Sequence, residues 1–110
     1  MFEPSFLKFF RTLARNNNRE WFNEHKPEYK QNVVEPLCAF IAAMAPRLNK
    51  ISKQFNADPR PNGVSMFRIY RDVRFAKDKS PYKLHAACQF RHSVGKDAHA
   101  PGFYVHIAPD

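Results

Sequence analysis

The chain has little glycine and no long hydrophobic run among its 110 residues. Its three glycines lie too far apart to form one of the glycine-rich loops that cradle phosphates. The longest apolar run, from Leu37 to Ala45, stops at Pro46 and is too short to span a bilayer. Because no basic-then-apolar leader opens the chain either, we expect a cytoplasmic protein with no membrane partner.

Cysteine is scarce as well, and its placement argues against redox or metal chemistry. Cys38 and Cys88 lie inside apolar stretches and far from any paired-ligand spacing, which predicts buried, unreactive thiols. His85 and His106 could meet on the polar face of a sheet. Two histidines without a third ligand are nevertheless a weak signal for zinc. We therefore expect no metal and no cofactor.

Acidic residues are few, with 10 Asp and Glu against 18 Lys and Arg, so the formal net charge is +8 and the sequence pI is about 9.8. This excess favours an anionic partner without saying which one. Aromatic residues are plentiful at 15% of the chain, which indicates a folded protein because large rings offset the entropy of ordering. The length supports one small domain.

The first half of the chain has the period of helices. Pro4 suits a first helical turn, and an apolar stripe at i, i+3, i+4 and i+7 follows it. The stripe consists of Phe6, Phe9, Phe10 and Leu13. Asn17 followed three residues later by Glu20 fits a capping box, so a second helix is predicted to begin there. On that helix, His25 is interpreted as a packed or capping residue beside Trp21 and Tyr29.

Two prolines shape the remaining helical part. Pro27 predicts a kink or restart, and Pro36 predicts a bend or the beginning of a longer helix that reaches Ile51. The apolar residues that hold the helical period in this longer helix are Val33, Leu37, Phe40, Ile41, Met44, Leu48 and Ile51. Residues 52–63, which include Pro59 and Pro61, are expected to form a loop.

The second half changes to alternation, which is typical of strands. Three strands are expected, with apolar faces made by Phe67, Ile69, Val73 and Phe75, by Leu84, Ala86, Cys88 and Phe90, and by Phe103, Val105 and Ile107. Arg71 falls on the apolar side, so a bulge or early strand end is expected near it. The order predicts an α+β fold, with helices in 4–51 packed on one face of a small, mainly antiparallel sheet in 64–110. Because the last strand ends within three residues of Asp110, we interpret the sheet as incomplete.

Positive charge concentrates in what we call the basic segment, residues 68–83. Its 16 positions hold six of the 18 basic residues, namely Arg68, Arg71, Arg74, Lys77, Lys79 and Lys83. Arginine forks bind phosphate or carboxylate oxygens, lysines add point charge, and neighbouring rings can stack on bases or sugars. Ser80 could cap a short helical turn begun by Pro81, whose backbone N–H groups would also favour an anion. We predict an anion-binding site here.

An alternative is that the carboxylates of the basic segment simply pair with its own cations. Asp72 and Asp78 are its only acids, and such surface ion pairs contribute little each. Two acids against six bases still leave about four positive charges in the segment. The residues predicted to support an anion site are Asp72, Asp78, Ser80 and Tyr82, with Arg19 added if the second helix starts beside the segment.

Two long motifs resemble a known family. The first runs from Asn16 to Phe22, as Asn-Asn-Asn-Arg-Glu-Trp-Phe, and the second runs from Arg71 to Lys83. Together with the final strand, they are similar to the uncharacterised conserved family catalogued as domain of unknown function 2461. That family has no established activity, so the resemblance implies no catalytic residues. Its members are longer, which implies that this chain is an N-terminal part on which its own C-terminal portion packs.

Three functions stay open on the sequence alone. The first is binding of a small phosphate- or carboxylate-bearing ligand by the basic segment. The second is a nucleic-acid-binding module whose polar sheet face exposes Arg68, Tyr70, Arg74, Arg91 and Tyr104, although no known nucleic-acid fingerprint is present. The third is a protein-interaction domain whose basic face meets an acidic protein or the remainder of the domain. We rank them in this order.

Overall fold

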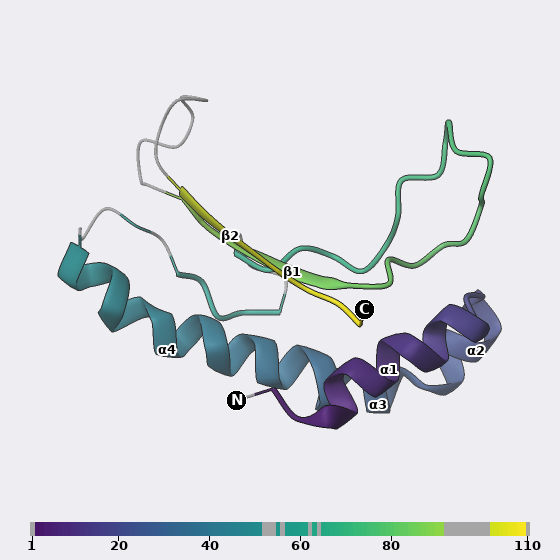
Figure 1. The fold of residues 1–110 in the computed structure, drawn as a ribbon, viewed down its shortest axis with the longest axis horizontal. Coiled ribbons are helices and arrows are strands. Elements are labelled where there is room, and N and C mark those ends of the chain that lie inside the picture. The colour runs from purple at the N-terminus through teal and green to yellow at the C-terminus, as the bar shows by residue number, and fades with distance from the viewer. Residues whose placement is uncertain are drawn as a thin grey trace.

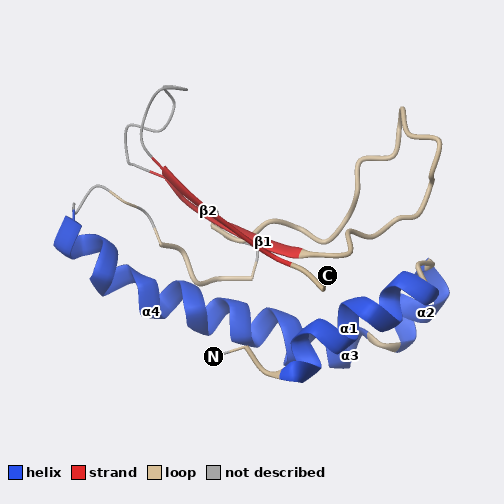
Figure 2. Cartoon of the chain, in the orientation of Figure 1, coloured by secondary structure: helices blue, strands red, loops and turns tan. Residues whose placement is uncertain are grey.

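A computed structural model of the chain describes residues 2–51, 55, 57–61, 63, 65–91 and 102–109. Helices form one layer and a two-stranded antiparallel sheet lies over them as a second, open layer (Figure 1). Figure 2 shows that the helices cover only one face of the sheet, while a long loop extends beyond it over α1 and α2. The α+β class and the packing of helices on one face of an open antiparallel sheet are confirmed.

The N-terminal helices follow the sequence closely. Helix α1 (Pro4–Arg15) has proline in its first turn, and its stripe of Phe6, Phe9, Phe10 and Leu13 is buried as predicted. Helix α2 (Arg19–Glu24) begins one residue later than expected, because Asn18 and not Asn17 is its N-cap. The Asn18 Oδ1 accepts the Trp21 N–H at 2.8 Å, so the predicted Asn17–Glu20 capping box is wrong.

Both prolines that were expected to shape the next helices do so. Helix α3 (Lys26–Tyr29) restarts the chain with Pro27 in its first turn, and a π-helical turn, η1 (Lys30–Val34), joins it to α4 (Glu35–Ile51). Pro36 is the second residue of α4 and directly follows the π turn, so its missing N–H leaves a carbonyl of that turn without its usual helical donor.

Helix α4 departs from expectation at its far end. Its buried residues are Leu37, Ile41 and Leu48, and the helix continues through Pro46. Ile51, predicted to belong to the apolar stripe, is 69% exposed at the last residue of the helix, three residues beyond the buried Leu48. Within the described part of the chain, none of the helices combines the length and apolar character needed to cross a membrane. The cytoplasmic location stays a prediction.

The sheet contains β1 (Ala86–Arg91) and β2 (Gly102–Ile107), paired antiparallel with Cys88 opposite Val105. Ala86, Cys88 and Phe90 point into the core, which confirms the predicted inner face of β1. Leu84 was expected on that face and is 41% exposed because it precedes the strand. The part of the expected β-rich region at 92–101 lies outside the described residues.

The expected first strand over residues 67–75 is wrong. In the described stretch 65–83 the bridges are instead isolated ones, Met66 with Cys88 and Tyr70 with Tyr82. The residues that reach the core are Met66 and Ile69, three apart instead of two, so the backbone turns between the bridges and no continuous ladder forms. Phe75, expected in the core, is 94% exposed beyond the second bridge. The pairing ends near Arg71, as the sequence suggested.

Candidate functional site

The basic segment is fastened to the helices by the side chain of Asn17, which was predicted to cap the second helix. Asn17, between α1 and α2, donates from Nδ2 to the Tyr82 carbonyl at 2.9 Å and accepts the Tyr82 N–H on Oδ1 at 3.1 Å. The side-chain amide therefore forms hydrogen bonds with both the N–H and the carbonyl of Tyr82, as the backbone of a neighbouring strand would. The phenol ring of Tyr82 stacks on Phe22, with centroids 4.2 Å apart.

Beside this contact lies a hollow of about 290 Å³ that we call the Arg71 hollow. Of the eleven predicted site residues, it gathers five: Arg71, Asp78, Ser80, Tyr82 and Lys83. Arg71 Nη1 donates to the Ser80 carbonyl at 2.9 Å and lies 3.6 Å from Asp78 Oδ2. Part of the Arg71 fork thus holds the loop closed, while the residue stays half-buried at the wall of the hollow.

The turn at Ser80 differs from the predicted one. Asp78 Oδ1 accepts both the Ser80 N–H at 2.9 Å and the Ser80 hydroxyl at 2.6 Å, and these bonds hold the pKa of Asp78 below its usual range. No helical turn begins at Pro81, because the Tyr82 and Lys83 N–H groups donate to Asn17 and to the Ile69 carbonyl. The backbone anion site expected from that turn is therefore wrong.

Several cations of the basic segment make contacts within it. Arg74 binds both oxygens of Asp72, with Nη2 2.8 Å from Oδ2, and these bonds lower the pKa of Asp72. Lys79 Nζ donates to the Val73 carbonyl at 2.7 Å, and Lys83 Nζ donates to the Arg68 carbonyl at 2.8 Å. The alternative prediction, that both acids pair with cations of the segment, therefore describes the geometry: Asp72 pairs with Arg74 and Asp78 with Arg71.

The remaining predicted residues lie outside the hollow. Arg19 lies close enough to Tyr82 to oppose the rise in its phenol pKa that burial causes. Arg74, Lys77 and Lys79 do not line the hollow. Arg68 lies over the Tyr70 ring, 5.8 Å from its centroid, and borders a different and larger space. The structure therefore divides the six cations instead of converging them on one point.

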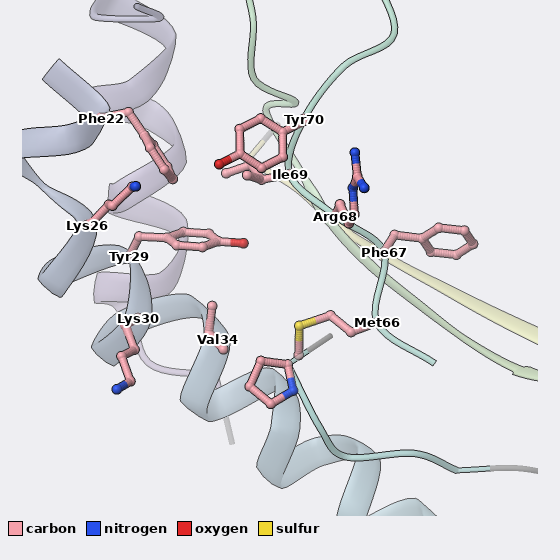
Figure 3. A pocket seen from close by; sticks show the side chains of 11 residues that line it. Phe22, Lys26, Tyr29, Lys30, Val34, Met66, Phe67, Arg68, Ile69 and Tyr70 are labelled. Atoms are coloured by element: carbon pink, nitrogen blue, oxygen red, sulfur yellow. The ribbon is translucent and has the colours of Figure 1, made fainter. Parts of the chain in front are cut away.

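That larger space, which we call the tyrosine cavity, has a volume of about 580 Å³ and lies between the α2–η1 helices and residues 66–70. Its apolar walls include Phe22, Val34, Met66, Phe67 and Ile69. The hydroxyls of Tyr29 and Tyr70 point into the space from opposite walls, and Lys26 and Arg68 stand at its border, while the amine of Lys30 turns outward (Figure 3). No Asp or Glu is among the described lining residues.

The helical wall of this cavity was missed from the sequence. The stripe of Trp21, Phe22, His25 and Tyr29 was assigned to packing, and part of it does pack: His25 stacks on Trp21 at 4.1 Å and its Nδ1 contacts the Trp21 carbonyl at 2.7 Å. Tyr29 is only partly buried, however, and it reaches the space beside Lys26. The sequence did contain one indication of this wall, because Lys26 and Tyr29 are three residues apart and therefore lie on the same face of a helix.

Burial governs the acidity of the inner groups. It raises the pKa of Tyr29 to about 12, with smaller contributions from Tyr70 and Cys38, so the phenol remains a hydrogen-bond donor at neutral pH. Burial likewise raises the pKa of Cys88 to about 11 and that of Cys38 above its usual range. The prediction of unreactive thiols agrees with these shifts, although Cys38 is only partly buried.

The Tyr29 shift predicts a dependence of stability on alkaline pH. Because the folded chain holds the phenol proton to about pH 12 and the unfolded chain releases it near 10.0, stability is unaffected below that range and falls as pH rises through it. When the pH is raised from about 9 to about 11, the free energy of unfolding measured in urea should fall by about 1 kcal/mol more for the natural chain than for Tyr29→Phe. Tyr104→Phe is the control, because it alters a ring that is 59% exposed, and its free energy of unfolding should fall as much as that of the natural chain.

The two histidines that the sequence allowed to meet on the polar face of the sheet do meet. His85 and His106 stack with centroids 4.1 Å apart and planes 14° from parallel. Burial, and then the neighbouring His106 and Lys83, lower the pKa of His85. Among the described residues, no group of three or more His, Cys, Asp or Glu side chains is placed to hold a metal ion.

The structure thus defines a small α+β protein with an open sheet and a basic, ring-lined cavity. The chain belongs to the family described as conserved hypothetical protein (DUF2461), whose match covers residues 5–110. This match confirms the family that the two motifs indicated. No curated protein and no solved structure matches the chain.

Proposed function

We propose that the chain binds a small organic anion, a carboxylate or phosphate on an apolar body, in the tyrosine cavity. One observation carries the proposal: the described lining combines apolar walls with Lys26 and Arg68 at the border and contains no carboxylate. Its volume of about 580 Å³ falls in the range typical of small-molecule sites. A neutral ligand would gain nothing from this excess of positive charge.

The walls suit an apolar or aromatic body. Phe22 is 2% exposed and Ile69 is 6% exposed, so the floor is set by packed side chains and is formed before any ligand arrives. Met66 adds a thioether, which accommodates rings of different shape. Apolar contact with these residues supplies affinity in proportion to the area removed from water.

The polar groups suit the anionic end of the ligand. Lys26 on α3 and Arg68 on the opposite segment both border the space, and Tyr29 offers a hydroxyl that stays protonated. Charge-assisted hydrogen bonds to a carboxylate or phosphate are stronger than neutral ones. The Arg71 hollow is the weaker candidate because it is half the volume, contains Asp78, and has Arg71 engaged with the loop.

The test is a thermal-shift titration of the chain with 2-naphthoate, 2-naphthyl phosphate, uncharged 2-naphthamide and inorganic phosphate. Ligands that bind the folded state raise the Tm in proportion to their occupancy. Both naphthyl anions should stabilise the chain. Arg68→Gln and Lys26→Gln should each weaken binding about tenfold, because each removes a charge-assisted contact.

Lys50→Gln is the matched control, because Lys50 is exposed on α4 and lines neither cavity. It should bind both anions as the natural chain does. Equal stabilisation by 2-naphthamide, or an equal loss in Lys50→Gln, would contradict the proposal. If inorganic phosphate stabilises the natural chain but not Arg71→Gln, the anion binds in the Arg71 hollow and not in the tyrosine cavity.

A further inference from the structure

The face of the sheet that is turned away from the helices carries a line of aromatic side chains. Phe67 contacts Tyr104 with centroids 5.7 Å apart, Tyr104 contacts His106 at 6.3 Å, and His106 stacks on His85 at 4.1 Å. We call these four residues the ring row. Phe67 is 38% exposed and Tyr104 is 59% exposed, so both rings reach solvent.

The strand register places the ring row on this outer face. Ala87 pairs with His106 and Gln89 with Tyr104, and paired residues share a face of the sheet. The inner face of β1 is made by Ala86, Cys88 and Phe90. Ala87 should therefore be open to solvent, yet it is only 4% exposed. The large side chains of the ring row beside it account for that burial, so the row is a packed surface layer.

The charge of this face is positive. Lys83 Nζ lies 5.7 Å from the centroid of Phe67, Arg68 lies over Tyr70, and Arg91 is exposed at the end of β1. Neither β1 nor β2 contains an Asp or Glu. The face thus has cations beside its rings, and the whole chain has a formal net charge of +8.

We propose that the ring row is a binding surface for single-stranded nucleic acid, with bases stacked on Phe67 and Tyr104 and phosphates near Lys83 and Arg68. Every base has a π face, so aromatic side chains on an open sheet bind single strands with little sequence preference. A duplex keeps its bases stacked internally and cannot use the rings in this way. A globular protein partner is less favoured, because the row is one ring wide and is flanked by polar residues such as Gln89.

The proposal is separate from the tyrosine cavity, although Phe67 and Arg68 border both. Lys26→Gln should weaken the naphthyl anions and leave nucleic-acid binding unchanged, because Lys26 lies on α3 beneath the sheet. Tyr104→Leu should have the opposite pattern. The two proposals can therefore fail independently.

The experiment measures fluorescence anisotropy of a labelled oligothymidylate of about 16 nucleotides with the whole chain at low salt. Tyr104→Leu and Phe67→Leu should each weaken binding about tenfold, and Tyr104→Phe should bind as the natural chain does because it keeps the ring. Lys83→Gln should reduce the slope of log affinity against log salt by about 0.7, the loss of one phosphate contact.

Phe75→Leu is the matched control, because it removes a ring that is 94% exposed and lies outside the ring row. It should leave affinity unchanged. The proposal would be overturned by no binding at low salt, by an equal loss in Phe75→Leu, or by competition from polyphosphate as effective per charge as competition from unlabelled oligothymidylate. Binding of anionic lipid vesicles without binding of the oligonucleotide would overturn it as well.

Discussion

Replacing Phe22 with alanine is expected to lower the free energy of unfolding by about 3–5 kcal/mol, the range for truncating a buried phenylalanine. Phe22 is 2% exposed and joins three parts of the fold. Its ring stacks on Tyr82 at 4.2 Å, contacts Tyr29 at 5.2 Å and meets Phe9 edge-on at 6.4 Å. The cavity left behind would open between α1, α3 and the basic segment, where rigid rings cannot close it.

Urea unfolding monitored by circular dichroism measures this loss. Phe75→Ala removes the same number of atoms from a ring that is 94% exposed and should change stability by less than about 0.5 kcal/mol. The free energy of unfolding of a domain is only about 5–15 kcal/mol, so Phe22→Ala could unfold the chain. Phe22→Leu is therefore a milder variant that should stay folded and lower the free energy of unfolding by about 1 kcal/mol. A loss below about 1 kcal/mol for Phe22→Ala would show that the stacked rings do not join α1, α3 and the basic segment.

The second large effect is expected at Asn17, where alanine should cost about 2–3 kcal/mol. The substitution removes both hydrogen bonds to the Tyr82 main chain, at 2.9 and 3.1 Å, and leaves a half-buried N–H and a half-buried carbonyl without their partner. Asn17→Asp should also destabilise the chain, because a carboxylate can accept from the Tyr82 N–H but cannot donate to its carbonyl.

Asn18→Ala is the natural comparison for Asn17→Ala. Asn18 makes one capping bond at an exposed helix start, so its loss should cost only about 1 kcal/mol. Chemical denaturation of the two variants side by side measures the difference. If Asn18→Ala proves the more costly of the two, the amide of Asn17 does not fasten the basic segment to the helices.

The helices could be predicted from the sequence because their signals are local. The stripe of Phe6, Phe9, Phe10 and Leu13 and the prolines at 27 and 36 act within one or two turns. The capping error at Asn17 has a long-range cause. Its amide is taken by Tyr82, 65 residues away, and the neighbouring asparagine caps the helix in its place.

The basic segment shows the limit of the same reasoning. Alternation in residues 67–75 resembles a strand, but whether it pairs depends on which residues reach the core, and Met66 and Ile69 override the pattern. The clustering of six cations was visible in the sequence. Their division between two spaces was not, because it depends on contacts such as Arg71 with the Ser80 carbonyl. The tyrosine cavity needs α3 beside residues 66–70, which no local pattern encodes.

The π-helical turn at Lys30–Val34 gives the cavity a dependence on spacing as well as on residue identity. A π turn contains one more residue than an α turn. The side chains after it are therefore rotated about the helix axis by about 100° relative to those before it. Tyr29 precedes this turn and Val34 ends it, and both line the same space. The helix thus brings together two residues that a uniform α-helix would direct apart. The length of chain between Tyr29 and Val34 is accordingly as much a part of the site as the side chains themselves.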